Sequence, residues 1–288
     1  MRPPPLMNCP RCNSTHISKT GFFLRKLSKS YSQRYVCTDC GKKFSASTFS
    51  NTYYQKKPMI NSILFQLLCS STSFRRSAKI LNVSFFTVYS RFLWMANLAE
   101  SAHSEFLKHY VPISEFYLDE MESIEHTKLK PLTIPLLLDR EQNILEVNCG
   151  RIPAKGYLAE ISRKKYGARS NESAHLIQKM LISLPQSITP VLMKSDGKQS
   201  YRSLVSRRWP GIRHEVHIRK PDKKKELLFL NYEKKKFDPM FALNQRCAKL
   251  RDDIKRLARK NWCTTKRPEN LARHLLIYAC YNNQVSII

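Results

Sequence analysis

Apolar residues change their spacing along the chain and divide it into three predicted segments. Residues 1–52 alternate aromatic and basic positions between two pairs of cysteines, as strands do. Residues 53–112 place apolar side chains three and four positions apart, which predicts helices; the first such group is Ile60, Ile63, Leu64, Leu67 and Leu68. Residues 113–288 alternate short apolar runs with helical patterns, so this last segment is expected to be an α/β domain.

Short apolar runs bounded by turn residues predict four strands in the last segment, at 116–120, 131–139, 143–149 and 188–196. The first three follow one another closely, with a turn at 140–143, and are expected to pair as a meander. Helical spacing predicts helices at 155–161, 175–184, 201–209 and 243–260.

Two Cys-x-x-Cys pairs mark the first segment as a zinc ribbon. Cys9 and Cys12 form one pair, and Cys37 and Cys40 form the other after 24 intervening residues. Each pair brings two thiolates onto one tight turn, and two such turns complete the tetrahedral sulfur shell that suits zinc. The ion is expected to be structural, because so short a segment scarcely has a core of its own. The alternative is four free thiols that do not meet.

A helix-turn-helix is predicted within residues 53–112. Ala78 is small enough for two helices to approach closely, Asn82 suits a left-handed turn position, and Ser84 can cap the next helix. That second helix would present three side chains to the major groove of DNA: Thr87, Ser90 and Arg91. An ordinary helical hairpin with a basic face is the alternative.

Two of the expected strands end in an aspartate. Asp119 closes the strand at 116–120, and Asp196 closes the strand at 188–196. Side chains from different strands can converge at strand ends, and carboxylates are the hard oxygen ligands that magnesium prefers. Glu120 points to the opposite face of an ideal strand and is expected to be structural. The alternative for each aspartate is a surface carboxylate without a ligand.

The charge balance indicates a polyanionic partner. The chain has 50 Lys+Arg against 22 Asp+Glu, a formal net charge of +28 over 288 residues. Such an excess favours nucleic acid, because side chains that neutralise phosphates release bound counterions. Basic runs at 219–225 and 234–236 would follow the DNA backbone. Trp209 and Trp262 are expected in the core, with stacking on a DNA base as the alternative. No apolar run is long enough to predict a membrane span.

Taken in order, these motifs resemble the bacterial insertion-sequence transposases of the DDE type. The order runs from the two cysteine pairs through the helix-turn-helix to Asp119-Glu120 and then Ser195-Asp196-Gly197. The stretches 119–131, 151–156 and 262–266 are similar to a subgroup of these proteins, and the resemblance covers nearly the whole chain. It implies a ribonuclease H-like catalytic domain at 113–288, with a mixed sheet flanked by helices. It also implies DNA cleavage and strand transfer with magnesium held by Asp119 and Asp196.

The resemblance implies a third metal ligand on the late helix, where family members carry Glu or Asn. Asn244 fits the Asn form, and Arg251, two turns further along the same face, is expected to hold phosphate. Asp252 and Asp253 are the alternatives for the third ligand.

An active enzyme of this class would bring two DNA ends together, as a homodimer or larger assembly, in the cytoplasm on the bacterial nucleoid. The alternative function is a DNA-binding regulator that keeps the zinc ribbon and the helix-turn-helix but has lost catalysis.

Overall fold

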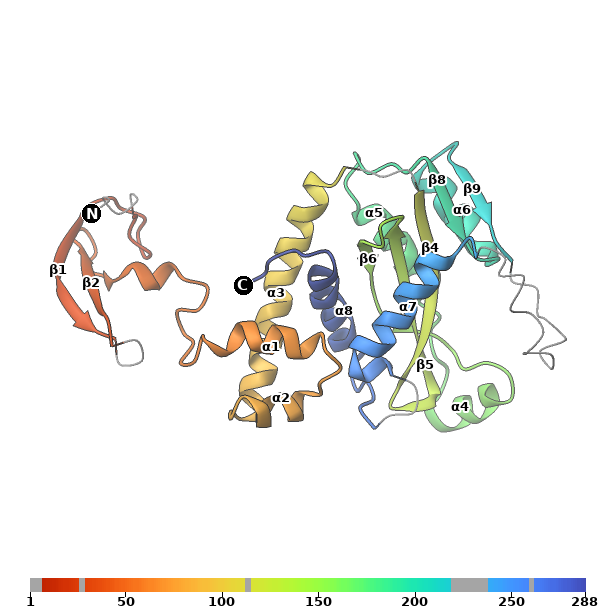
Figure 1. The fold of residues 1–288 in the computed structure, drawn as a ribbon, viewed down its shortest axis with the longest axis horizontal. Helices are drawn as coiled ribbons and strands as arrows, with labels where there is room; N and C mark the ends of the chain where they lie inside the picture. Colours follow the sequence, from red (N-terminus) through yellow and green to blue (C-terminus); the bar gives the residue numbers. More distant parts are fainter. Residues whose placement is uncertain (1–6, 26–28, 112–114, 219–237, 259–261) are drawn as a thin grey trace. The chain divides into compact units, whose positions relative to one another are not determined.

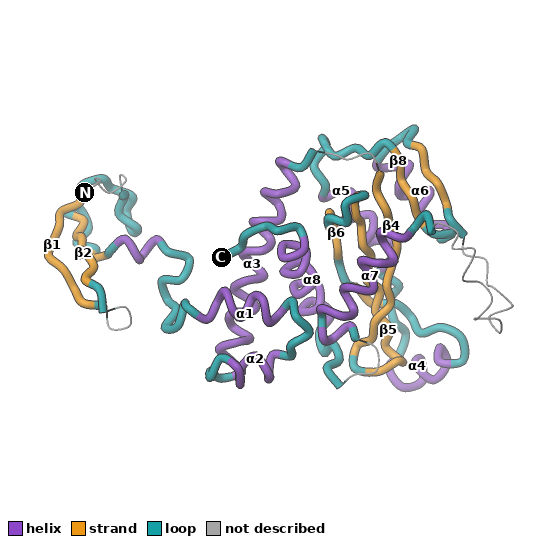
Figure 2. The backbone as a smooth tube through the Cα atoms, viewed as in Figure 1, coloured by secondary structure: helices purple, strands orange, loops and turns teal. Residues whose placement is uncertain are grey.

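The computed structural model describes residues 7–25, 29–111, 115–218, 238–258 and 262–288. It divides the chain into two compact units, Met1–Ile60 and Asn61–Ile288. Figure 1 shows the course of the chain, and Figure 2 shows where its helices and strands lie. The basic runs at 219–225 and 234–236 lie outside the described residues.

The smaller unit is a three-stranded antiparallel sheet around a very small core. Its strands, β1 (Ile17–Leu24), β2 (Tyr31–Cys37) and β3 (Lys43–Phe44), are followed by a short 3-10 helix, η1 (Ala46–Phe49). The buried apolar side chains are Cys9, Tyr35, Cys37 and Phe44. So small a core stabilises little by burial alone, which is the situation in which a bound metal supplies folding free energy.

The larger unit begins with α1 (Ile60–Leu68), α2 (Phe74–Ile80) and α3 (Phe85–His109). Serine hydroxyls cap two of these helices: Ser73 accepts from the backbone N–H of Arg76 at 3.3 Å, and Ser84 accepts from that of Thr87 at 3.1 Å. Between the two helices Asn82 has a φ of 49°, the left-handed conformation that asparagine tolerates. These details confirm the predicted turn and the predicted cap.

A mixed six-stranded sheet forms the centre of the larger unit. Three strands form an antiparallel meander: β4 (Glu115–Glu125), β5 (Thr127–Asp139) and β6 (Ile144–Val147). Two more extend the sheet from β4 in parallel: β8 (Leu192–Ser195) and β9 (Arg213–Val216). The order is β6-β5-β4-β8-β9, and β7 (Gly150–Arg151) pairs with β5.

Helices cover both faces of this sheet, so successive side chains of β4 enter different cores. Phe116 and Leu118 pack on the side of α5 (Ser173–Ser183) and α6 (Gln199–Arg208). Tyr117 and Met121 pack on the other side, which carries α3, α7 (Phe241–Asp253) and α8 (Pro268–Asn282). A further helix, α4 (Leu158–Tyr166), contacts β5. In Figure 1, α7 crosses in front of β4. By alternation, Asp119 lies on the α7 side of the sheet and Glu120 on the α5 side.

The described helices depart from the sequence prediction in their bounds and in their packing. α3 continues unbroken to His109, and its Met95 and Ala99 enter the same core as the sheet, so residues 53–112 share their packing with the α/β segment. The helix expected at 243–260 ends at Asp253, because Ile254 has extended backbone angles and leads into a 3-10 turn, η2 (Lys255–Leu257). None of the described helices is both long and apolar enough to cross a membrane.

Candidate functional sites: a cysteine cluster and an aspartate pair

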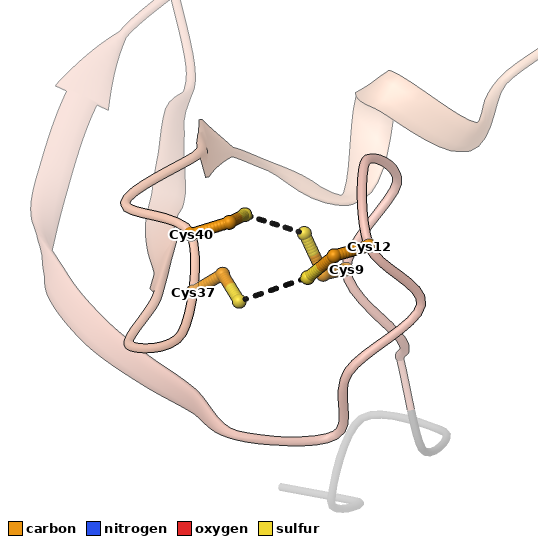
Figure 3. A group of neighbouring side chains, drawn as sticks. All are labelled: Cys9, Cys12, Cys37 and Cys40. Atoms are coloured by element: carbon orange, nitrogen blue, oxygen red, sulfur yellow. Dashed lines mark hydrogen bonds between the residues drawn. The ribbon is translucent and has the colours of Figure 1, made fainter.

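Four cysteine side chains of the smaller unit meet at one point. Their sulfur atoms all lie within 4.8 Å of one another, and they come from Cys9, Cys12, Cys37 and Cys40. Figure 3 marks two of the sulfur contacts, Cys9 with Cys40 at 3.5 Å and Cys12 with Cys37 at 3.6 Å. A tetrahedral zinc ion with Zn–S bonds of about 2.3 Å requires sulfur atoms about 3.8 Å apart. The four thiolates therefore fit one zinc ion without an open position.

The two cysteine turns have the same local construction. The backbone N–H of Asn13 donates to the carbonyl of Cys9, and that of Gly41 donates to the carbonyl of Cys37, each at 2.9 Å. Both donors have a positive φ, 58° for Asn13 and 69° for Gly41. Burial opposes ionisation of Cys9, but backbone N–H groups of Cys12 and Arg11 donate to its sulfur and lower the pKa of the thiol to about 6. Hydrogen bonds with neighbouring cysteines contribute to raised pKa values at Cys12 and Cys40, so without metal the thiolate is favoured at Cys9 and disfavoured at these two. The thiolate is the form that binds metal.

Asp119 and Asp196 lie next to each other where the parallel pairing of β4 and β8 ends. Contrary to the sequence prediction, Asp119 does not close its strand, because β4 continues to Glu125 in pairing with β5. The last residues of β4 and β8 in register are Leu118 and Ser195, so the two aspartates follow at equivalent positions. Burial first, and then the negative charge of Asp196, raise the pKa of Asp119 to about 6. The backbone N–H of Glu120 works in the opposite direction, because it donates to Asp119 Oδ1 at 2.6 Å. The chain thus holds two carboxyl groups together at a cost in charge repulsion.

Among the described residues, this pair belongs to no group of three or more His, Cys, Asp or Glu ligands. Two carboxylates are nevertheless sufficient for magnesium, which commonly keeps several waters and takes one or two carboxylates from the protein. The donor set therefore fits magnesium, with the remaining positions left to water, a neutral oxygen or substrate.

Lys198 connects the segment that carries Asp196 to the strand that carries Asp119. Its backbone N–H donates to Asp196 Oδ1 at 3.0 Å, while its Nζ donates to Glu120 Oε2 at 2.6 Å. Glu120 also accepts a hydrogen bond from Ser173 Oγ at the start of α5. Because Glu120 directly follows Asp119, one lysine fixes the loop that carries Asp196 onto the strand that carries Asp119. Lys198 did not stand out in the sequence, where its only signal is its position two residues after Asp196.

Tyr201 of α6 was missed as well. It is buried, and Lys198 Nζ lies 5.4 Å from the centre of its ring. Burial first, and then the charges of Glu120, Asp119 and Asp196, raise the pKa of its hydroxyl. The phenol therefore stays neutral close to three carboxylates.

Helix α7 covers the side of the sheet that carries Asp119. Burial raises the pKa of the Cys247 thiol to about 12, the charge of Asp119 adds to this effect, and Arg251 opposes it. Asn244, Cys247 and Arg251 stand three and four positions apart and therefore share one face of the helix. The Cys247 thiol, which did not stand out in the sequence, is thus close enough to Asp119 for the carboxylate charge to raise its pKa.

The third-ligand candidates differ in their surroundings. Asn244 is exposed, and its Nδ2 donates to Asp238 Oδ2 at 2.8 Å; no hydrogen bond among the described residues joins it to either aspartate of the pair. Asp253 accepts a hydrogen bond from the Tyr278 hydroxyl at 2.6 Å, and Asp252 is exposed on α7. Asn244 as a ligand stays a prediction.

The side chains expected to read DNA lie on the first three turns of α3. Ser90 is exposed, and the Thr87 hydroxyl lies 3.0 Å from the Ser84 hydroxyl at the helix start. Arg91 is half-buried, and burial lowers the pKa of its guanidinium. Phe86, on the same turns, is 79% exposed and did not stand out in the sequence.

No protein-family model matches the chain, and no curated protein matches its sequence. The case for function is therefore made by the cysteine cluster, the aspartate pair and the charge of the chain.

Replacing one cluster cysteine tests the zinc site. Cys40→Ser is expected to lower the zinc content from about one ion per chain to nearly none, because three thiolates leave the tetrahedral shell incomplete. The helical circular dichroism signal should persist, since all eight α-helices of the described chain begin at Ile60 or later. Cys149→Ala, which alters a buried cysteine of the larger unit, is the control. Equal zinc contents in Cys40→Ser and Cys149→Ala would contradict a zinc site at the cluster.

Removing the charge of Asp119 tests its electrostatic strain. The pKa of Asp119 rises from its ordinary value of 3.8 to about 6 in the folded chain. The folded state is therefore increasingly penalised as the pH rises above about 4, and the penalty grows in full above about 6. Asp119→Asn is expected to raise the free energy of unfolding at pH 8, without magnesium, by about 1–3 kcal/mol. The gain should shrink as the pH falls through 6 and vanish near pH 4. Urea unfolding followed by circular dichroism measures it, with the exposed Asp252→Asn as control. A lower free energy of unfolding for Asp119→Asn than for the wild type at pH 8 would contradict the claim that the charge of Asp119 destabilises the folded chain.

Proposed function

We propose that the chain is a DDE-type transposase, which binds the ends of an insertion sequence and catalyses magnesium-dependent DNA cleavage and strand transfer. One observation carries the proposal: Asp119 and Asp196 follow the last paired residues of two adjacent parallel strands, and the charge of Asp196 contributes to the raised pKa of Asp119. Two carboxylates held this close repel each other, and a divalent cation between them offsets the repulsion.

The fold of the larger unit supports the same proposal. A meander of three strands is extended in parallel from its first strand, and helices lie on both faces. We infer that this mixed sheet is ribonuclease H-like, the architecture that the resemblance to transposases implies. Its metal-binding acids would then lie on strand ends, and its third ligand on the late helix α7.

Each residue of the site has a separate task. Magnesium held by Asp119 and Asp196 would activate the attacking water or DNA 3′-hydroxyl and stabilise the leaving oxygen. Asn244 would offer its amide Oδ1, since its Nδ2 is the atom bonded to Asp238. Arg251, on the face of α7 that includes Cys247, would hold a DNA phosphate close to the carboxylates.

DNA recognition is assigned to the zinc module and to the start of α3. Residues 1–60 contain eleven Lys+Arg and a single acid, Asp39. Such a balance suits contact with phosphates, while Thr87, Ser90 and Arg91 would read bases from the first turns of α3. Joining two DNA ends would require at least two copies of the chain.

A DNA-binding regulator without catalysis is the second candidate. Asn244 favours it, because its amide is hydrogen-bonded to Asp238 and has no described contact with the aspartate pair. Such a protein would bind zinc and DNA in the same way but would cut no strand.

Replacing Asp196 separates the two candidates. Asp196→Asn is expected to reduce magnesium-dependent nicking of DNA that carries the element ends by at least about 100-fold, because even residues behind the ligands commonly contribute 10–100-fold. DNA binding, measured by mobility shift on the same substrate, should be retained. Wild-type protein that binds this DNA yet nicks it with neither magnesium nor manganese would overturn the enzyme and favour the regulator.

Replacing Lys198 tests the support of the pair. Lys198→Met removes the bond to Glu120 and is expected to lower nicking by about 10–100-fold with DNA binding retained. Lys194→Met is the matched control, because Lys194 Nζ donates to Glu115 Oε2 at 2.9 Å and so links the same two strands further from the aspartates. Equal losses in both variants would show that Lys198 has no special role in positioning.

A further inference from the structure

The larger unit contains a cavity that lies apart from the aspartate pair. Its volume is about 510 Å³, and its walls come from the starts of α2 and α3, from η2, from residues 262–267 and from α8. None of its lining residues belongs to β4, β8 or α7. Segments far apart in the sequence therefore enclose a space that the proposed chemistry at Asp119 and Asp196 does not use.

The lining of this cavity is basic and contains no carboxylate. Five cations line it: Arg75, Lys255, Arg256, Lys266 and Arg267. Among the described residues, no Asp or Glu forms an ion pair with any of them. Arg256 is the most informative, because burial lowers the pKa of its guanidinium to about 10, and this guanidinium lies 5.1 Å from the centre of the Phe74 ring. A desolvated cation without an acid is costly, and an anionic ligand would offset that cost.

Aromatic rings also line the cavity, beside small and polar side chains such as Thr72, Cys263 and Asn270. Phe85 and Tyr89 are stacked at 6.3 Å with an angle of 3° between their planes. Trp262 is fully exposed, at 101%, contrary to the core position expected from the sequence, whereas Trp209 is buried as expected. Trp262 lines a basic cavity, but its indole is not covered by the rest of the described chain. Such a ring is suited to stacking against a planar ligand.

One polar atom of the lining has no partner. His274 Nε2 lies 2.8 Å from the carbonyl oxygen of Leu68 and so donates to it, which leaves Nδ1 as an acceptor. This Nδ1 is buried, and no hydrogen bond from the described residues reaches it. Burial, followed by the charge of Arg256, lowers the pKa of His274 to about 3, so the ring stays neutral. Because this Nδ1 has almost no exposed surface, a ligand in the cavity does not reach it, and His274 contributes only a neutral ring to the wall.

We propose that this cavity binds one unpaired nucleotide, with its phosphate against Arg256 and its neighbouring cations and its base on Trp262. Phosphate and planar base are the two chemical features that the lining matches. The source is either an unpaired position in a DNA strand or a free mononucleotide. The inference rests on the proposed role in DNA transactions for its setting, but not on metal-dependent catalysis.

The test measures binding without magnesium, so that loss of nicking and loss of this site are distinguishable. A fluorescein-labelled single-stranded hexanucleotide is titrated with the full chain, and anisotropy is followed alongside a blunt duplex. Trp262→Ala is expected to weaken binding of the single strand by about 10-fold, within the 5-fold to 150-fold that stacking of one base on an aromatic side chain supplies. Trp262→Phe should recover most of the loss, and duplex binding should change little.

Two controls make the result specific. Tyr157→Ala removes an aromatic that is 84% exposed beside α4, away from the cavity, and should leave single-strand binding unchanged. Lys266→Gln should weaken the single strand more than Lys179→Gln, which alters an exposed lysine of α5. Equal effects of Trp262→Ala and Tyr157→Ala, or equal effects on single strand and duplex, would overturn the site. Displacement of the labelled hexanucleotide by millimolar mononucleotide would assign the site to free nucleotides. No displacement at that concentration would assign it to a DNA strand.

Discussion

Parallel pairing between β4 and β8 is the constraint on which the rest of the larger unit depends. Four residue pairs, from Glu115 with Leu192 to Leu118 with Ser195, fix the register. A slip of one residue would turn one aspartate to the opposite face, because side chains alternate along a strand. Everything proposed for catalysis follows from this register, since it brings together two carboxylates that are 77 positions apart in the sequence.

The pair of aspartates lowers the stability of the folded chain, and hydrogen bonds from neighbouring groups hold the pair in place. Asp119 is half-buried beside a second carboxylate, and burial raises its pKa to about 6. The backbone N–H groups of Glu120 and Lys198 each donate to one aspartate, and the Lys198 side chain joins the two strands behind them. Residues devoted to binding commonly cost stability in this way. The two sheet cores, built from apolar side chains on both faces of β4, make the strained pair tolerable.

Local chemistry made part of this structure predictable. The spacing of the cysteines predicted a cluster because a Cys-x-x-Cys turn needs only neighbouring residues, and Asn82 and Ser84 likewise take conformations set by their own side chains. The end of β8 could be placed because its apolar run stops at Asp196. The end of β4 was predicted wrongly, because the strand expected at 116–120 continues to Glu125 in pairing with β5.

Features that depend on packing between distant segments could not be read from the sequence. Cys247 faces Asp119 only because α7 crosses β4, and Lys198 matters only because its side chain reaches Glu120. Trp262 was expected in a core because tryptophan is usually buried, yet it is exposed. The end of α7 at Asp253 follows from the extended conformation of Ile254, whose side chain is buried.

The central claim is that Asp119 and Asp196 together bind a divalent metal. The most direct measurement is anomalous X-ray diffraction from crystals of the protein soaked in manganese, which takes the same hard oxygen ligands as magnesium. We expect an anomalous peak within coordination distance of a carboxylate oxygen from each aspartate, and no such peak in crystals of Asp196→Asn. Manganese peaks elsewhere on the molecule, with none between these two carboxylates, would contradict the account.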